Sequence, residues 1–313
     1  MKEIITPVEK EKIIAELTPE RFLRNTNKGG NQIYIIDHRN APDTMREIGR
    51  LREITFRLAG GGTGKEIDID MFDMMENPCR QLIVWNPDAQ EIIGGYRFIL
   101  GEDICYDEQG RPVIASSHMF DFSPKFIEEY MPYTIELGRS FVVPEYQSSR
   151  AGAKGLFALD NLWDGLGALT VNYPQIKYFF GKFTMYPTFG EAARNMILFF
   201  LNKHFADTDN LVWPRTPLET HSNYKSLNEL FPKDNSFKED YKILNQEVRA
   251  LGLNIPPLVN SYMNLSPTMR IFGTAINDEF GNVEESGILI AIDEILDEKK
   301  KRHIDTYERD SKI

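Results

Sequence analysis

A carboxylate and a guanidinium lie close together near the middle of the chain, at Glu136 and Arg139. The surrounding stretch, residues 133–146, is rich in β-branched and aromatic residues and reaches a proline at Pro144, which predicts a strand that runs into a loop. Regular alternation along a strand would point the two charges to opposite faces. Gly138 lies between them and predicts a β-bulge, whose extra residue would bring both charges to one side.

Such a pair at a break in a central strand fits the transfer of an acyl group to an amine. This reaction needs an uncharged amine, a thioester within attack distance and donors for the oxygen that becomes anionic. We expect Glu136 to remove the amine proton, directly or through a water, and Arg139 to hold Glu136 or a substrate carboxylate. Backbone amides at the bulge would stabilise the oxyanion. The alternative is a structural ion pair at a strand end.

The composition of the chain is ordinary for a soluble globular protein, and its net charge of −11 argues against a nucleic-acid-binding surface over the whole molecule. No apolar run reaches about 18 residues and the N-terminus lacks the apolar core of a signal peptide. We therefore expect a cytoplasmic protein, with at most a peripheral contact at the inner face of the membrane. Cys79 and Cys105 fit a reducing compartment, and the histidines are scattered singly, so we expect no metal site.

Several cations lie on or shortly after the central strand. They are Arg139, Arg150, Lys154, Lys177 and Lys182. An acidic protein that keeps cations in one region can use them on an anionic ligand. For any single one of them, a solvated surface position is the alternative.

The order of the predicted elements indicates an α/β fold. Residues 1–42 predict a polar, helical lead-in with one short strand, and a helix should then run from the cap residue Asp43 to the glycines after residue 59. Beyond residue 207 we expect one long helix at 224–251 and a solvated or frayed helix after Asp297. We further expect a hairpin at 81–85 and 91–100, helices at 155–169 and 187–205, and strands at 176–183, 269–275 and 287–292.

Four motifs in a fixed order resemble a known family. They are Arg52 with Phe56, Asp70-Met71-Phe72-Asp73, Gly95-Tyr96-Arg97 and Glu136-Leu137-Gly138-Arg139. Together they resemble the signature shared by acyl-homoserine-lactone synthases and the bacterial ornithine-lipid and glycine-lipid N-acyltransferases of the GNAT superfamily. Near the end, Gly273-Thr274-Ala275 with Asp278 and Phe280 is similar to proteins labelled hemolysin-like.

The resemblance implies a GNAT-like mixed, mostly antiparallel sheet with flanking helices and a C-terminal α/β extension. The expected division is a lead-in at 1–42, an acyltransferase domain at 43–206 and an extension packed on it at 207–313. The resemblance further implies a set of residues that shape the site for the acceptor and the pantetheine arm, namely Arg52, Phe56, Asp70, Asp73 and Arg97. As alternatives, Arg52 would be an exposed helix arginine and Arg97 a strand-end arginine. Asp70 and Asp73 would only cap a loop.

The donor is expected to be acyl carrier protein. Ordinary GNAT enzymes hold the pyrophosphate of coenzyme A in a glycine-containing turn at a helix N-terminus, and residues 147–155 do not fit that spacing. The phosphopantetheine of acyl carrier protein would then serve as co-substrate, with acyl-coenzyme A disfavoured and no further cofactor. Arg150, Lys154 and Lys182 would meet this partner.

The resemblance favours transfer of a 3-hydroxyacyl chain to the α-amine of glycine, which gives a lyso-aminolipid. Ornithine is the second candidate acceptor, and its extra ammonium would need a carboxylate such as Asp70 or Asp73. Otherwise these two aspartates only order the loop after Gly64. A synthase acting on S-adenosylmethionine is another enzyme alternative, for which we find no adenosine motif. A membrane-lytic hemolysin is the non-enzyme alternative.

Overall fold

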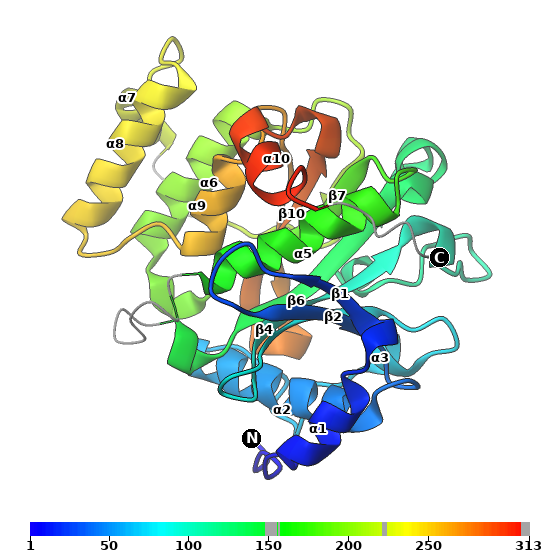
Figure 1. Cartoon of the computed structure of the whole chain (residues 1–313). Coiled ribbons are helices and arrows are strands. Elements are labelled where there is room, and N and C mark those ends of the chain that lie inside the picture. Colours follow the sequence, from blue (N-terminus) through cyan, green and yellow to red (C-terminus); the bar gives the residue numbers. More distant parts are fainter. Residues whose placement is uncertain (148–154, 156, 221–223, 308–313) are drawn as a thin grey trace.

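The computed structural model describes residues 1–147, 155, 157–220 and 224–307, and its centre is an eight-stranded sheet in the order β1-β2-β3-β4-β6-β7-β10-β9 (Figure 1). Neighbouring strands are antiparallel except β6 and β7, which run parallel. The strands are β1 Phe22–Asn25, β2 Gln32–Ile36, β3 Arg80–Asn86, β4 Glu91–Leu100, β6 Thr134–Val142, β7 Tyr178–Met185, β9 Arg270–Asn277 and β10 Val283–Ala291. The α/β fold class expected from the sequence is therefore confirmed.

The N-terminal lead-in differs from its prediction because it contributes an edge strand, β1, after helix α1 (Lys10–Glu16). Helix α2 (Pro42–Ala59) begins one residue before Asp43, so this aspartate is not its cap. The carboxylate of Glu16 accepts the backbone N–H groups of Asp43 and Thr44 instead, at 3.0 and 2.7 Å. The helix ends as expected, at Gly60 in the left-handed conformation.

Helices α5 (Ala158–Asn172) and α6 (Glu191–Phe205) pack in the larger hydrophobic core of the sheet. The contact of α5 with β3 is so close that a Cβ added to Gly165 would lie 2.7 Å from the side chain of Leu82. A second core lies on the other face, between the sheet and the irregular segment 101–133. That segment includes the short strand β5 (Phe120–Phe122), which pairs with β8 (Val212–Pro214).

The C-terminal third shares the main sheet, because β10 pairs with β7 along its whole length. The single helix expected at 224–251 is wrong: the chain forms α7 (Tyr224–Leu230) and α8 (Phe237–Ala250), since Pro232 interrupts the helix and Ser236 caps a new one. Helix α9 (Pro257–Met263) follows. Helix α10 (Asp297–His303) forms where a solvated helix was expected and is largely exposed, but it also packs against α5 and buries His303. The proposed domain boundaries stay predictions.

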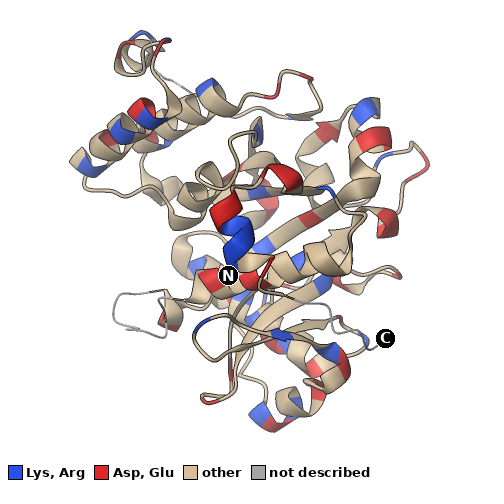
Figure 2. Ribbon diagram, turned by 45° about the horizontal axis from the view of Figure 1, so that its top comes forward, with Lys and Arg blue, Asp and Glu red and all other residues tan. Residues whose placement is uncertain are grey.

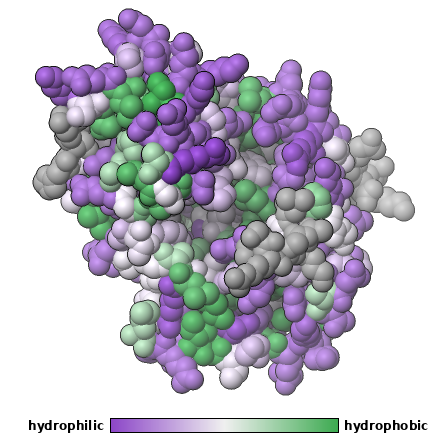
Figure 3. Space-filling view, turned by 90° about the vertical axis from the view of Figure 1, so that its left-hand side faces the viewer, coloured by the Kyte–Doolittle hydropathy of each residue, from purple (hydrophilic) through white to green (hydrophobic). Residues whose placement is uncertain are grey.

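Charged side chains of both signs occur along the outer helices (Figure 2), and the face in Figure 3 is mainly hydrophilic with separate apolar patches. Among the described residues, no helix is long and apolar enough to cross a membrane.

Candidate active site

The predicted bulge forms between β4 and β6. Gly95 pairs with Phe141 and Arg97 pairs with Gly138, so one residue of β4 faces two residues of β6. Arg139, not Gly138, takes the left-handed backbone conformation, with φ of 48°. Next to this bulge the parallel strands separate: β6 and β7 pair from Thr134 to Leu137 and from Tyr178 to Gly181, and no further, although both strands continue.

A small space lies between the separated strands, and we call it the strand gap. Gly138, Ser140 and Lys182 line it, together with Tyr96 and Tyr262. The two tyrosine oxygens are 3.3 Å apart, and burial raises the pKa of Tyr96, so its hydroxyl keeps its proton at neutral pH. The strand gap thus supplies polar donors beside the bulge.

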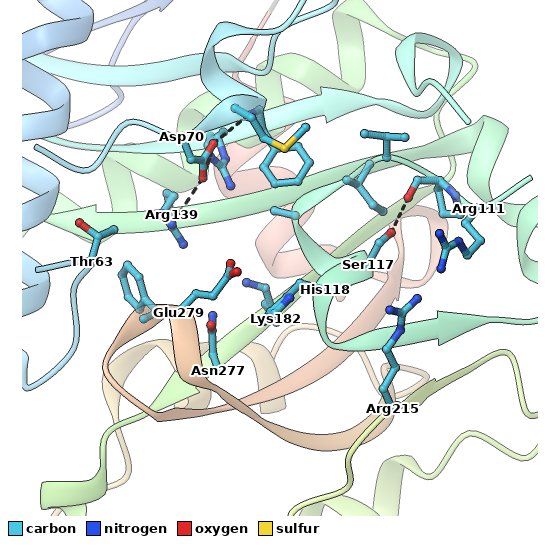
Figure 4. A pocket seen from close by; sticks show the side chains of 18 of the residues that line it. Thr63, Asp70, Arg111, Ser117, His118, Arg139, Lys182, Arg215, Asn277 and Glu279 are labelled. Carbon is cyan, nitrogen blue, oxygen red and sulfur yellow. Dashed lines mark hydrogen bonds and ion pairs between the residues drawn. The ribbon is translucent and has the colours of Figure 1, made fainter. Parts of the chain in front are cut away.

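A pocket of about 680 Å³ opens next to the bulge, and Lys182 lines both this pocket and the strand gap (Figure 4). Its wall carries six lysine and arginine side chains against three carboxylates, although the whole chain is strongly acidic. The cations are Lys65, Arg97, Arg111, Arg139, Lys182 and Arg215. An anionic ligand would therefore find a favourable potential there.

Beside and beneath the pocket, three arginines and three aspartates form one buried network, which we call the pocket cluster. Its members are Arg52, Arg97, Arg139, Asp68, Asp70 and Asp73.

Within the pocket cluster, Arg52 Nη2 lies 2.9 Å from Asp73 Oδ2, and Arg97 Nη1 lies 2.7 Å from both oxygens of Asp70. Arg139 Nε lies 2.9 Å from Asp68 Oδ2, and Figure 4 shows Arg139 reaching Asp70 as well. Burial alone would raise the pKa of Asp73, but the charges of Arg52 and Arg97 outweigh it and hold this pKa far below its usual value. Asp73 is therefore ionised at neutral pH.

Local structure explains how Asp70 and Asp73 reach their positions. They cap the short helix α3 (Met71–Met74): Asp70 Oδ1 accepts the backbone N–H of Phe72 at 2.9 Å, and Asp73 Oδ2 accepts that of Asp70 at 3.1 Å. The two aspartates thus order the loop through local bonds, as one sequence interpretation predicted, and they also bind arginines; their role toward a substrate stays a prediction.

Glu136 lies on the same face of the sheet as Arg97, because Ile99 pairs with Glu136 and Arg97 with Gly138. Its side chain is buried, and Oε1 accepts the Ser116 hydroxyl at 2.6 Å and the Ser116 backbone N–H at 3.1 Å. In the part of the chain that the structure describes, Arg139 pairs with aspartates and not with Glu136. Sequence reasoning missed Ser116, since it lies in an irregular segment without a recognisable motif.

The other expected site residues are only partly brought together. Arg52 and Phe56 do not line the pocket; Arg52 is fully buried, and Phe56 packs edge-on against Phe280, whose ring lies 4.3 Å from the Arg139 guanidinium carbon. Lys177 lies over the ring of Tyr133, outside the pocket wall.

Lys182 is the expected carrier-binding residue that the structure describes, and it lines the pocket, where its ammonium lies 2.7 Å from Glu285. Arg150 and Lys154 lie outside the described residues.

The fold and the sequence together define the class of this protein. A family model described as an acetyltransferase (GNAT) domain matches residues 51–155, which include β3, β4, the bulge and the whole pocket cluster. The protein is a GNAT-type acyltransferase.

Curated relatives define the family more narrowly. Two proteins called glycine N(alpha)-acyltransferase, from Bacteroides thetaiotaomicron and Phocaeicola vulgatus, are 67% and 64% identical over 98% of this chain and 91% and 94% of their own lengths. An L-ornithine N(alpha)-acyltransferase from Brucella abortus is 27% identical over 69% of this chain and 68% of its own. The chain belongs to this family of amino-acid N-acyltransferases.

Among solved structures, a CoA-dependent acyl-homoserine-lactone synthase aligns with 53% of this chain, and the alignment covers 72% of the synthase chain. The sequence identity is 14% and the TM-score is 0.32. This likeness is too low to inform the fold or the site.

Proposed function

We propose that this protein transfers a 3-hydroxyacyl chain from acyl carrier protein to the α-amine of glycine, as a step in lyso-aminolipid synthesis. The observation that carries the proposal is the separation of β6 from β7 beside the bulge, next to a cationic pocket. Backbone amides beyond the end of the β6–β7 ladder would be the donors that a thioester oxygen requires as it becomes anionic. The names of the two glycine-specific relatives support the choice of acceptor.

Glu136 acts as the general base in this proposal. Ser116 donates hydrogen bonds to one of its carboxylate oxygens. The carboxylate lies behind the pocket wall, so in this proposal a water molecule carries the proton from the amine to it. The amine nitrogen then bonds to the thioester carbon, the carbon–sulfur bond breaks, and the departing thiolate takes up a proton. No covalent enzyme intermediate is needed.

The ion pairs that Asp70 and Asp73 make with arginines favour glycine over ornithine as the acceptor. An ornithine side chain would bring a second ammonium, which needs a carboxylate partner when it is buried. Both aspartates are already bound to arginines, and Asp73 is fully buried. Glycine requires only recognition of its amine and carboxylate.

The charge of the pocket supports acyl carrier protein as the donor. Its cations would attract the acidic surface of acyl carrier protein, and such a contact weakens as salt rises.

Met71 at the pocket and Met74 nearby are 61% and 53% exposed on α3, which supports a peripheral contact with the membrane that receives the lipid product. The family assignment favours an enzyme over the membrane-lytic alternative.

The test is a competition assay with purified protein, 3-hydroxyacyl-carrier protein and equal concentrations of glycine and ornithine, analysed by mass spectrometry. We expect mainly N-acylglycine. A pool dominated by N-acylornithine would overturn the acceptor, and a lactone formed with S-adenosylmethionine would overturn the reaction. Equal rates with acyl-coenzyme A, together with a carrier affinity that does not change with salt, would overturn the donor.

A further inference from the structure

Asn277 ends strand β9 in the wall of the pocket and has an unusual bonding state. Its side chain is 6% exposed, and its Nδ2 donates a hydrogen bond to Glu285 Oε2 at 3.3 Å. Within the described residues its Oδ1 has no hydrogen-bond partner. The orientation of the amide is physically determined, because a carboxylate only accepts and the NH₂ group must face Glu285. The amide oxygen is thus a buried acceptor without a donor.

The neighbours of Asn277 are charged and belong to the same pocket. Glu285 Oε2 also lies 2.7 Å from Lys182 Nζ, and Figure 4 shows Asn277 and Lys182 close together in the pocket view. Burial alone would raise the pKa of Glu285, but Lys182 outweighs it and lowers this pKa, so the carboxylate is ionised. A buried acceptor without a partner is destabilising, and a bound N–H group would relieve that cost.

We propose that Asn277 Oδ1 accepts a hydrogen bond from the α-amine of the amino-acid acceptor and so makes Asn277 a specificity residue for a primary amine. This inference rests on the proposed function. Lys182, on the same pocket wall, is placed for the carboxylate of the same molecule. Glu285 acts through both residues, since it binds the amide of one and the ammonium of the other.

The test compares Asn277→Val and Asn277→Thr, which have the same shape and both fit a strand, but only threonine keeps an oxygen. A hydrogen bond to a charged group is worth about 1.5–3 kcal/mol, so Asn277→Val should raise the KM for glycine about tenfold or more. Asn277→Thr should raise it less. The KM for the acyl donor should not change, and thermal unfolding checks that both variants fold.

Asn195 on α6 supplies a matched control. It is 9% exposed and its Oδ1 likewise has no partner among the described residues, but it does not line the active-site pocket. Asn195→Leu should leave the KM for glycine unchanged.

A KM for glycine within twofold of wild type in Asn277→Val would overturn the inference, as would an equal rise in the KM for the donor. If wild-type protein does not acylate glycine at all, the proposed function fails instead, so the two failures are distinguishable.

Discussion

Two buried polar networks of this molecule differ in their access to a cavity. The pocket cluster connects α2, the loop around α3 and the bulge, and Asp70, Arg97 and Arg139 also line the cavity. The second network, here called the seam cluster, joins β1, α5 and α10 through Arg24, Asn27, Asp164 and His303. In the seam cluster, Asp164 Oδ1 lies 2.7 Å from His303 Nδ1, and none of the four residues lines the active-site pocket.

The comparison shows that burial and ion pairing do not identify a functional site by themselves. Both networks hold together segments that are distant in the sequence, and both satisfy buried carboxylates with several donors. Only the pocket cluster is next to a cavity and a gap between strands. Access to a ligand, rather than the strength of the charges, separates the two.

The largest expected effect is at Glu136, beside the pocket cluster. Glu136→Gln should fold normally and bind acyl carrier protein, but should lose about 10²–10⁴-fold in turnover, because a general base typically contributes that much. Steady-state rates with glycine measure it. Near-wild-type turnover at neutral pH would remove Glu136 from the mechanism.

The second prediction compares the pocket cluster with the seam cluster through the variants Asp73→Ala and Asp164→Ala. Each change leaves buried groups without their partner, so each should lower the free energy of unfolding by about 3–5 kcal/mol, measured by urea denaturation. At a temperature where both variants are folded, Asp164→Ala should keep its turnover and Asp73→Ala should lose it. Equal turnover in the two variants would contradict the distinction between the clusters.

The smallest effect is the acid dependence of stability. The pKa values of Asp68 and Asp73 are lowered in the folded state, since the surrounding arginines outweigh burial. Their contribution is therefore complete above the unfolded value of about 3.9 and is lost as the pH falls below it.

Asp73→Asn removes one of these carboxylates, so the free energy of unfolding should change less steeply below about pH 4 than in wild type, by at most one proton or about 1.4 kcal/mol per pH unit. Denaturation series at several pH values measure this slope. An unchanged slope would mean that Asp73 does not contribute.

Much of the central fold was predictable because its signals are local. Two strand-like runs joined by the turn residues Asn86-Pro87-Asp88 identified the hairpin of β3 and β4, and Gly138 indicated the bulge. The predictions failed where a distant segment determines the structure: Glu16 caps α2 from another helix, and β1 forms only by pairing with β2.

The sequence by itself determined that Glu136, Arg139, Asp70 and Arg97 occur on strands and loops of an acyltransferase, since periodicity and short motifs act over a few residues. The tertiary structure alone decided their partners. Ser116 reaches Glu136 and Asp68 reaches Arg139 because the segment 101–133 and the loop after α2 fold onto the same face of the sheet. The unpartnered oxygen of Asn277 likewise becomes a candidate site only when burial removes it from water beside Glu285.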